Sequence, residues 1–239
     1  MRRLLSILAS FFPSRDRNYS RDFQVFEHGF HGDQYLITAV TRTMPKVETF
    51  VETGTNVGTT ARYMAEMYQG IPVYSCEPDP EAFRIAQQNL KEYKNVSLYK
   101  MKSPDFLYRI HSEYPELNEK LNFYFLDAHG YGYTWPLRDE VKFITNTLSE
   151  AIILIDDVRV PHLPHHFRYD NYESQVCDLE HIVESLASNR TYVICYPNYT
   201  ERTSRHHPLT GYMFVGYGEQ VTRLVQDYGD NFLVTTLKR

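Results

Sequence analysis

A glycine-containing turn near residue 50 is the first group of residues that could do chemistry. Glycine allows a tight turn and a close backbone approach to a ligand, and a helix beginning after the turn offers free N–H groups. The residue order differs from the G-x-G-x-x-G and G-x-x-x-x-G-K-[ST] motifs, which disfavours a phosphate cradle. An acid before the glycines would repel a pyrophosphate and attract a cationic group such as an ammonium. The segment reads Glu52-Thr53-Gly54-Thr55-Asn56-Val57-Gly58.

A second acid, Glu77, lies 25 residues after Glu52, at the end of the next apolar run. A carboxylate in this place can accept hydrogen bonds from both hydroxyls of a ribose. Ser103 and Asp105 follow a third such run and are placed to bind the edge of an adenine. Asp79 precedes Pro80 and is expected to cap a helix rather than to bind a ligand.

Three further acids follow two compact apolar runs later in the chain. The run 121–126 ends at Asp127, and the run 151–155 ends at Asp156 and Asp157. Carboxylates gathered at the ends of neighbouring strands repel one another unless a cation, a proton or a donor compensates them. A hard, oxygen-preferring ion such as Mg²⁺ would do so. The same acids could instead contact a cofactor or cap helices.

The elements that must position these residues alternate between strand-like and helix-like segments. This alternation is typical of a parallel sheet with crossover helices, in which ligands bind beyond the carboxyl ends of the strands. No repeat or linker interrupts it, so we predict one domain over 33–239. The expected strands are 47–52, 73–76, 95–100, 121–126, 151–155, 192–195 and 212–217. The expected helices are 34–44, 59–68, one beginning at Asp79 and Pro80, 105–112, 137–148 and 172–187, with loops at 159–170 and 197–210.

Over residues 47–217 the sequence resembles the class I S-adenosylmethionine-dependent methyltransferases. The resemblance is carried by Glu52-x-Gly54-x-x-x-Gly58, by Glu77 and by the later strand-end acids. It implies a doubly wound, mostly parallel, seven-stranded Rossmann-like sheet with helices on both faces. It also implies that Glu52 and the turn with Gly54, Thr55, Asn56 and Gly58 hold the methionine portion of the cofactor, with Asp127 nearby. Glu77 would then hold the ribose, and Ser103 and Asp105 the adenine.

The acids also resemble the metal site of O-methyltransferases of the catechol type and of the macrolide and aminocoumarin sugar type. In those enzymes an acid after the fourth strand and an acidic or amide pair after the fifth hold the metal, which Asp127, Asp156 and Asp157 match. Catechol-type enzymes carry a lysine three residues after the first acid, where this chain has Gly130. His129 is the local alternative as a base, because an imidazole titrates near neutral pH. A structural role for His129 is weighed equally.

Composition narrows the partners and the compartment. The net charge of −5 removes a broad attraction to nucleic acid, and three widely spaced cysteines favour a reducing, cytoplasmic compartment. The N-terminal run from Leu4 to Phe12 is far shorter than the roughly 20 residues that span a bilayer. We expect residues 1–32 to form an amphipathic extension. It would dock on the domain or on a second copy in a homo-oligomer, or attach peripherally to a membrane through residues 2–21.

Together these features predict methyl transfer from S-adenosylmethionine to a hydroxyl oxygen, assisted by a divalent ion that is expected to be Mg²⁺. Asp127 and His129 are the expected catalytic residues, and the acceptor would be a sugar, a glycosylated natural product or a polyphenol. Two alternatives stay open. The acids alone could serve a metal-dependent hydrolase, or the domain could bind the cofactor without turnover, as an assembly partner.

Overall fold

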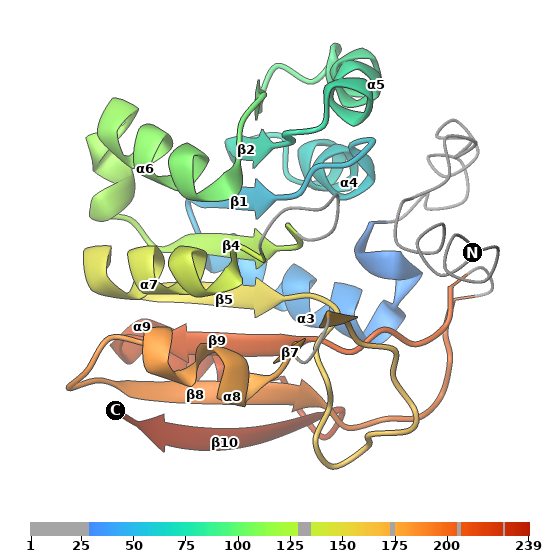
Figure 1. Ribbon diagram of the computed structural model, residues 1–239, viewed down its shortest axis with the longest axis vertical. Helices are drawn as coiled ribbons and strands as arrows, with labels where there is room; N and C mark the ends of the chain where they lie inside the picture. Colours follow the sequence, from blue (N-terminus) through green and yellow to red (C-terminus); the bar gives the residue numbers. More distant parts are fainter. Residues whose placement is uncertain (1–28, 129–134, 173–174, 205–206, 227) are drawn as a thin grey trace, which may run out of the picture.

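The computed structural model describes residues 29–128, 135–172, 175–204, 207–226 and 228–239. Its main feature is an eight-stranded sheet with the order β10-β8-β9-β5-β4-β1-β2-β3 (Figure 1). Strands β1 to β5 run parallel, whereas β9 and β10 are antiparallel to their neighbours. The strands are β1 Thr49–Thr53, β2 Val73–Cys76, β3 Val96–Tyr99, β4 Asn122–Leu126, β5 Ala151–Ile155, β8 Thr191–Pro197, β9 Met213–Tyr217 and β10 Phe232–Lys238.

Helices connect the parallel strands and cover the sheet. Helices α6 and α7 lie against each other on the near face in Figure 1, and α3 lies behind the sheet. Asp33 and Asp79 cap α3 and α5 as the sequence predicts, because each side chain accepts two backbone N–H groups of the first turn. The helices are α3 Gln34–Thr43, α4 Thr59–Met67, α5 Pro80–Leu90, α6 Ser103–Glu113, α7 Leu137–Thr147, α8 Leu179–Ile182 and α9 Glu219–Gln226, with short 3₁₀ turns η1 Phe30–Gly32, η2 Met44–Lys46, η3 Pro115–Asn118 and η4 Val183–Ser185.

The direction of the connections reverses between β1 and β4. From β1 the chain proceeds outward to β2 and β3, and then it returns to β4 and β5 on the other side. In the register of the two central strands, Thr53 lies opposite Leu126, so both strands end at the same level. Ligands of open α/β sheets bind at such a reversal, beyond the carboxyl ends of the strands. The fold therefore places the residues after β1, β2, β4 and β5 around one edge.

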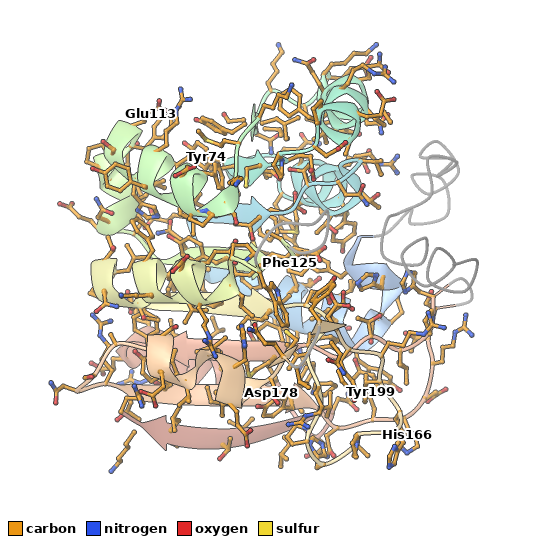
Figure 2. The ribbon with its side chains drawn as sticks, viewed as in Figure 1. Tyr74, Glu113, Phe125, His166, Asp178 and Tyr199 are labelled. Carbon is orange, nitrogen blue, oxygen red and sulfur yellow. The ribbon has the colours of Figure 1, made fainter. Side chains whose placement is uncertain are left out.

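The core lies on both faces of the central strands. Every residue of β1, β4, β5 and β9 is buried. Figure 2 shows Phe125 in the middle of the sheet, where it is 2% exposed. The three cysteines are buried and unpaired, which agrees with the absence of a disulfide framework. Within the described ranges, no helix combines the length and the apolar character that crossing a membrane requires.

The structure corrects the predicted helix 172–187. This segment forms the small hairpin of β6 Asn171–Tyr172 and β7 Gln175–Val176, followed by the one-turn α8 and η4. Asp178 adopts an extended conformation and caps α8, so the helix begins only at Leu179. Before the cap, the backbone of Cys177 bonds Asp170 and Arg159 in the preceding loop. These tertiary backbone bonds outweigh a helical propensity that is weak in itself.

The C-terminal end of the sheet also differs from the prediction, because it has eight strands rather than seven. Helix α9 and strand β10, both after residue 217, were not anticipated. Strand β10 pairs along its whole length with β8 and is mostly exposed or half-buried. An edge strand of this kind carries a weak hydrophobic pattern, because it buries only part of one face.

Candidate cofactor and acceptor site

The turn after β1 requires glycine at its first position. Gly54 has a φ of +84°, and a Cβ there would overlap the backbone carbonyl of Asp127 at the end of β4. The backbone N–H groups of Gly54 and Thr55 both donate to the carbonyl of Cys76, at 3.0 and 2.9 Å. Gly58, with a φ of +90°, precedes the first turn of α4. The turn is thus tied to both neighbouring strands, with the N-terminus of α4 following it.

Glu52 lies under this turn and is 1% exposed. The hydroxyl of Ser75 on β2 donates to its carboxyl group and is in turn bonded to the hydroxyl of Thr55. Burial raises the pKa of Glu52 to about 8; the bond from Ser75 opposes this shift, and the charge of Glu77 adds to it. Around neutral pH the carboxyl is therefore mostly protonated. A cation that bound beside it would favour the ionised form.

Glu77 directly joins the turn to the end of β2. Its two carboxylate oxygens accept the backbone N–H of Asn56 at 2.7 Å and of Asp79 at 2.9 Å. The side chain is 3% exposed, and burial raises its pKa. Each carboxylate oxygen has more than one lone pair, so these two bonds orient Glu77 and leave acceptor capacity for a diol.

Ser103 and Asp105 differ in their surroundings, although both belong to the start of α6. Ser103 is buried, and its hydroxyl has no hydrogen-bond partner among the described residues. A buried hydroxyl without a partner is costly, which marks it as available to a bound group. Asp105 is exposed in the first turn of α6. The structure thus brings Ser103 into the interior and leaves Asp105 at the surface.

The three acids predicted to bind a metal, Asp127, Asp156 and Asp157, follow β4 and β5 and lie at the same edge of the sheet. The backbone N–H of Asp127 donates to Thr53 at 3.0 Å, and that of Asp156 donates to Leu126 at 3.1 Å. Asp156 is 3% exposed, and Asp157 is half-buried with a φ of +52°. This left-handed conformation is uncommon for residues other than glycine, and it is best tolerated by Asn and Asp.

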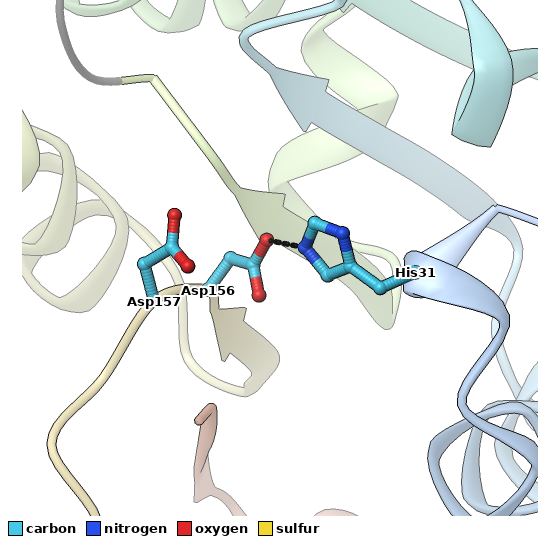
Figure 3. A group of neighbouring side chains, drawn as sticks. All are labelled: His31, Asp156 and Asp157. Carbon is cyan, nitrogen blue, oxygen red and sulfur yellow. Dashed lines mark hydrogen bonds and ion pairs between the residues drawn. The ribbon is translucent and has the colours of Figure 1, made fainter. Parts of the chain in front are cut away.

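A histidine that the sequence analysis did not select completes this edge. The Nε2–H of His31 donates to Asp156 at 2.6 Å (Figure 3). Burial by itself would lower the pKa of His31, but Asp156, through its charge and the hydrogen bond, raises it to about 9, with Asp127 and Asp157 contributing. His31 is therefore charged at neutral pH. One donor atom each from His31, Asp156 and Asp157 lie within 4.8 Å of one another, whereas Asp127 is outside this group.

The conformation of residues 29–32 explains how His31 reaches the site. Gly29, Phe30, His31 and Gly32 all have positive φ, from 44° to 68°. Left-handed backbone costs a non-glycine residue about 1–2 kcal/mol, so Phe30 and His31 need compensation from their packing. Phe30 supplies it, because it is 1% exposed and meets Phe125 edge-on at 5.2 Å between ring centroids. The end of the N-terminal extension is thus part of the domain core.

The imidazole of His207 packs against the imidazole of His31. The two rings lie 4.3 Å apart, and burial and the charge of His31 lower the pKa of His207 to about 4. His207 also lines a small pocket with His31, Arg202 and Ser204. The pocket falls partly in the segment 197–210, which the sequence predicts to be a loop. Neither histidine belongs to a recognisable motif, and the flanking glycines were the only local sign that residue 31 is special.

His129, together with the aromatic residues at 131 and 133, lies outside the described residues. Trp135 is half-buried and stacks on His181 at 4.7 Å. The loop histidines at 165 and 166 are exposed, and Figure 2 shows His166 at the periphery. The expected surface loop at 159–170 is thereby confirmed.

Comparison with known proteins places this geometry in a fold family. No family model matches the sequence, and no curated protein matches it. An O-methyltransferase from Bacillus cereus in complex with SAH superimposes with a TM-score of 0.50 at 15% identity, covering 90% of this chain and 88% of that one. A protein from Klebsiella pneumoniae that is assigned as an O-methyltransferase superimposes with a TM-score of 0.50 at 16% identity. The match covers 90% of this chain and 95% of that one.

A third neighbour shows how far the fold likeness extends. An rRNA methylase from Streptococcus thermophilus also has a TM-score of 0.50, at 10% identity, over 78% of this chain and 98% of that one. These neighbours differ in the acceptors that their names imply, so the likeness concerns the architecture. The chain has the fold of the class I S-adenosylmethionine-dependent methyltransferases, as the resemblance of residues 47–217 implies.

Proposed function

We propose that this protein is an S-adenosylmethionine-dependent methyltransferase. The observation that carries the proposal is the hydrogen bonding of Glu77, which connects the end of β2 to the turn after β1. Two backbone N–H groups fix its carboxylate at the end of β2, beside the point where the strand order reverses. The same edge holds a turn that admits only glycine at residue 54 and a buried hydroxyl at Ser103.

The residues present fit this cofactor. Glu77 would accept the ribose hydroxyls, and the hydroxyl of Ser103, which lacks a partner among the described residues, would meet the adenine. Glu52 and Asp127 place two carboxyl groups at the ends of β1 and β4, which suit the ammonium of the methionine portion. Asp105 would act only from the surface. When bound, the cofactor supplies a methyl group on a sulfonium, which an aligned nucleophile can displace in line.

We further propose that the acceptor atom is a hydroxyl oxygen and that a divalent ion assists the transfer. Asp156 and Asp157 meet at the end of β5, and the charge of Asp127 acts on the same place. An ion held by these acids would lower the pKa of an acceptor hydroxyl. Asp127 would orient the acceptor, and His129 is proposed as the group that accepts its proton. A sugar, a glycosylated natural product or a polyphenol would offer the required hydroxyls.

Calorimetric titration of S-adenosylmethionine into chelator-stripped protein tests the cofactor assignment. We expect saturable binding by the wild type and roughly 10- to 100-fold weaker binding by Glu77→Gln, because one charge-assisted acceptor is lost. Glu81→Gln is a matched control, since Glu81 is exposed on α5 and pairs with Arg84. It should bind like the wild type. Absence of binding by folded wild-type protein would contradict the proposal.

A metal-dependent hydrolase is the second candidate, and the cluster of His31, Asp156 and Asp157 is the observation that favours it. A hydrolase would be indifferent to S-adenosylmethionine, so the same titration separates the two candidates. A domain that binds the cofactor as an assembly partner would bind it without turnover on any acceptor. The proposed peripheral membrane contact through residues 2–21, and docking of this segment on a second copy, concern residues outside the described ones.

A further inference from the structure

A nitrogen donor lies beside the two carboxylates at the end of β5. Figure 3 shows Asp156 between Asp157 and the imidazole of His31. One donor atom from each residue lies within 4.8 Å of the other two, so small side-chain rotations would bring all three onto one ion. Binding of the ion would release the proton that the Nε2 of His31 donates to Asp156, because a ligating imidazole is neutral. We propose that His31, Asp156 and Asp157 form a mixed nitrogen–oxygen site for a first-row transition-metal ion, and that the N-terminal turn supplies one of its ligands.

The inference rests on the proposed function, since this ion would act at the acceptor side of the same site. It changes the expected chemistry, however, because three acids alone favour Mg²⁺. Carboxylate and water ligands suit Mg²⁺, Ca²⁺ and Mn²⁺, whereas an imidazole suits the transition metals. With a histidine in the ligand set, affinity should rise from Mn²⁺ towards Co²⁺ and Ni²⁺.

The turn that carries His31 is built to hold it in place. Phe30 is fixed in the core between the rings of Phe50, Tyr63 and Phe125. A Cβ on Gly29 would approach the side chain of Tyr63 to 3.1 Å, so the glycine permits close packing of the turn against α4. Asp33, the residue after this turn, accepts a hydrogen bond from the hydroxyl of Tyr199 at 2.6 Å. The imidazole is thus fixed from both sides along the chain.

The electrostatic surroundings favour a doubly charged ion. The side chain of Asp156 is 1% exposed and that of His31 is 26% exposed, so the pair is shielded but remains accessible from outside. The charges of Asp127, Asp156 and Asp157 all act on His31. A divalent cation beside these buried and half-buried carboxylates would compensate their mutual repulsion.

Metal titrations of the chelator-stripped full chain test the site. By calorimetry we expect one Co²⁺ per chain, bound at least about tenfold more tightly than Mg²⁺. His31→Gln should weaken Co²⁺ binding by about tenfold or more and affect Mg²⁺ much less. His165→Gln is the matched control, because His165 is exposed in the loop 159–170. It should leave both affinities unchanged.

A spectroscopic measurement identifies the ligand directly. Pulsed EPR of the Mn²⁺-loaded protein should show coupling to an imidazole nitrogen, and the coupling should disappear in His31→Gln. Asp157→Asn is a second variant that keeps a residue tolerant of the φ of +52°. It should weaken Co²⁺ binding while the fold is retained, as checked by the unfolding midpoint without metal.

Two results would overturn the inference: no saturable Co²⁺ binding by the wild type, or a His31→Gln variant that binds Co²⁺ and shows the nitrogen coupling like the wild type. S-adenosylmethionine binding, measured in the presence of chelator, separates this failure from failure of the proposed function. If the cofactor binds but the metal does not, only the metal site is wrong. If Co²⁺ binds through His31 but the cofactor does not, the methyltransferase proposal is wrong.

Discussion

The two halves of the candidate site are built in different ways. The cofactor half consists of the turn after β1 and the ends of β2 and β3, which follow one another along the chain within 52–103. The acceptor half joins residues that are far apart, since His31 bonds Asp156 across 125 positions. The cofactor half is a local motif held together by neighbouring strands. The acceptor half depends on the docking of an N-terminal turn, so a mutation in that turn should disturb the acceptor half and leave the cofactor half intact.

The largest expected effect separates the two halves. Phe30→Ala should lower the free energy of unfolding by roughly 3–5 kcal/mol, because a fully buried ring is lost from the core. It should also release His31 and abolish Co²⁺ binding. The affinity of the folded protein for S-adenosylmethionine should change little. Denaturant unfolding and the two titrations measure these effects.

Phe30→Leu provides the control for this prediction, since it keeps most of the apolar volume and should lose less stability. An equal loss of cofactor and metal affinity in Phe30→Ala would show that the two halves are not independent.

A change in the cofactor half should have a somewhat smaller effect on stability. Gly54→Ala is expected to cost about 3 kcal/mol, because the φ of +84° is strained for alanine and the added Cβ meets the backbone of Asp127. Gly70→Ala is the matched control. A Cβ at Gly70 meets nothing within 4 Å, so this variant should lie within roughly 0.5 kcal/mol of the wild type. Similar unfolding midpoints for the two variants would contradict the structure of the turn.

A further expected effect concerns how stability changes with pH. Burial raises the pKa of Glu52 from its usual value near 4.5 to about 8 in the folded protein. Between these values the folded state holds a proton that the unfolded state releases, so stability from this group falls as pH rises from about 5 to 8. Glu52→Gln removes the ionisation and should flatten the decline, as urea unfolding across this range would show. An unchanged slope in the variant would contradict the raised pKa.

Sequence reasoning succeeded where residues act through their neighbours along the chain. The alternation of elements predicted the parallel strands, and Asp79 was correctly interpreted as a cap because capping depends on the next three residues. The positions of Gly54 and Glu77 at adjacent strand ends followed from the same logic. Strand β10 was missed because an edge strand buries little surface, and helix 172–187 was wrong because backbone bonds to the preceding loop override propensity.

The acceptor half was only partly predictable for the same reason. Asp156 and Asp157 directly follow a buried strand, which placed them at the edge of the sheet. His31 reaches them through a left-handed turn whose conformation depends on the packing of Phe30 against β1, α4 and β4. No periodicity in the sequence encodes that contact. His31 and His207 therefore became visible only in three dimensions.

A crystal structure of the full chain with S-adenosylhomocysteine bound would test the central claim most directly. The account predicts that the ribose hydroxyls contact the carboxylate of Glu77 and that the adenine lies against Ser103, with the methionine portion over the turn from Gly54 to Gly58. A ligand bound elsewhere on the sheet, or none in crystals soaked to saturation, would contradict it.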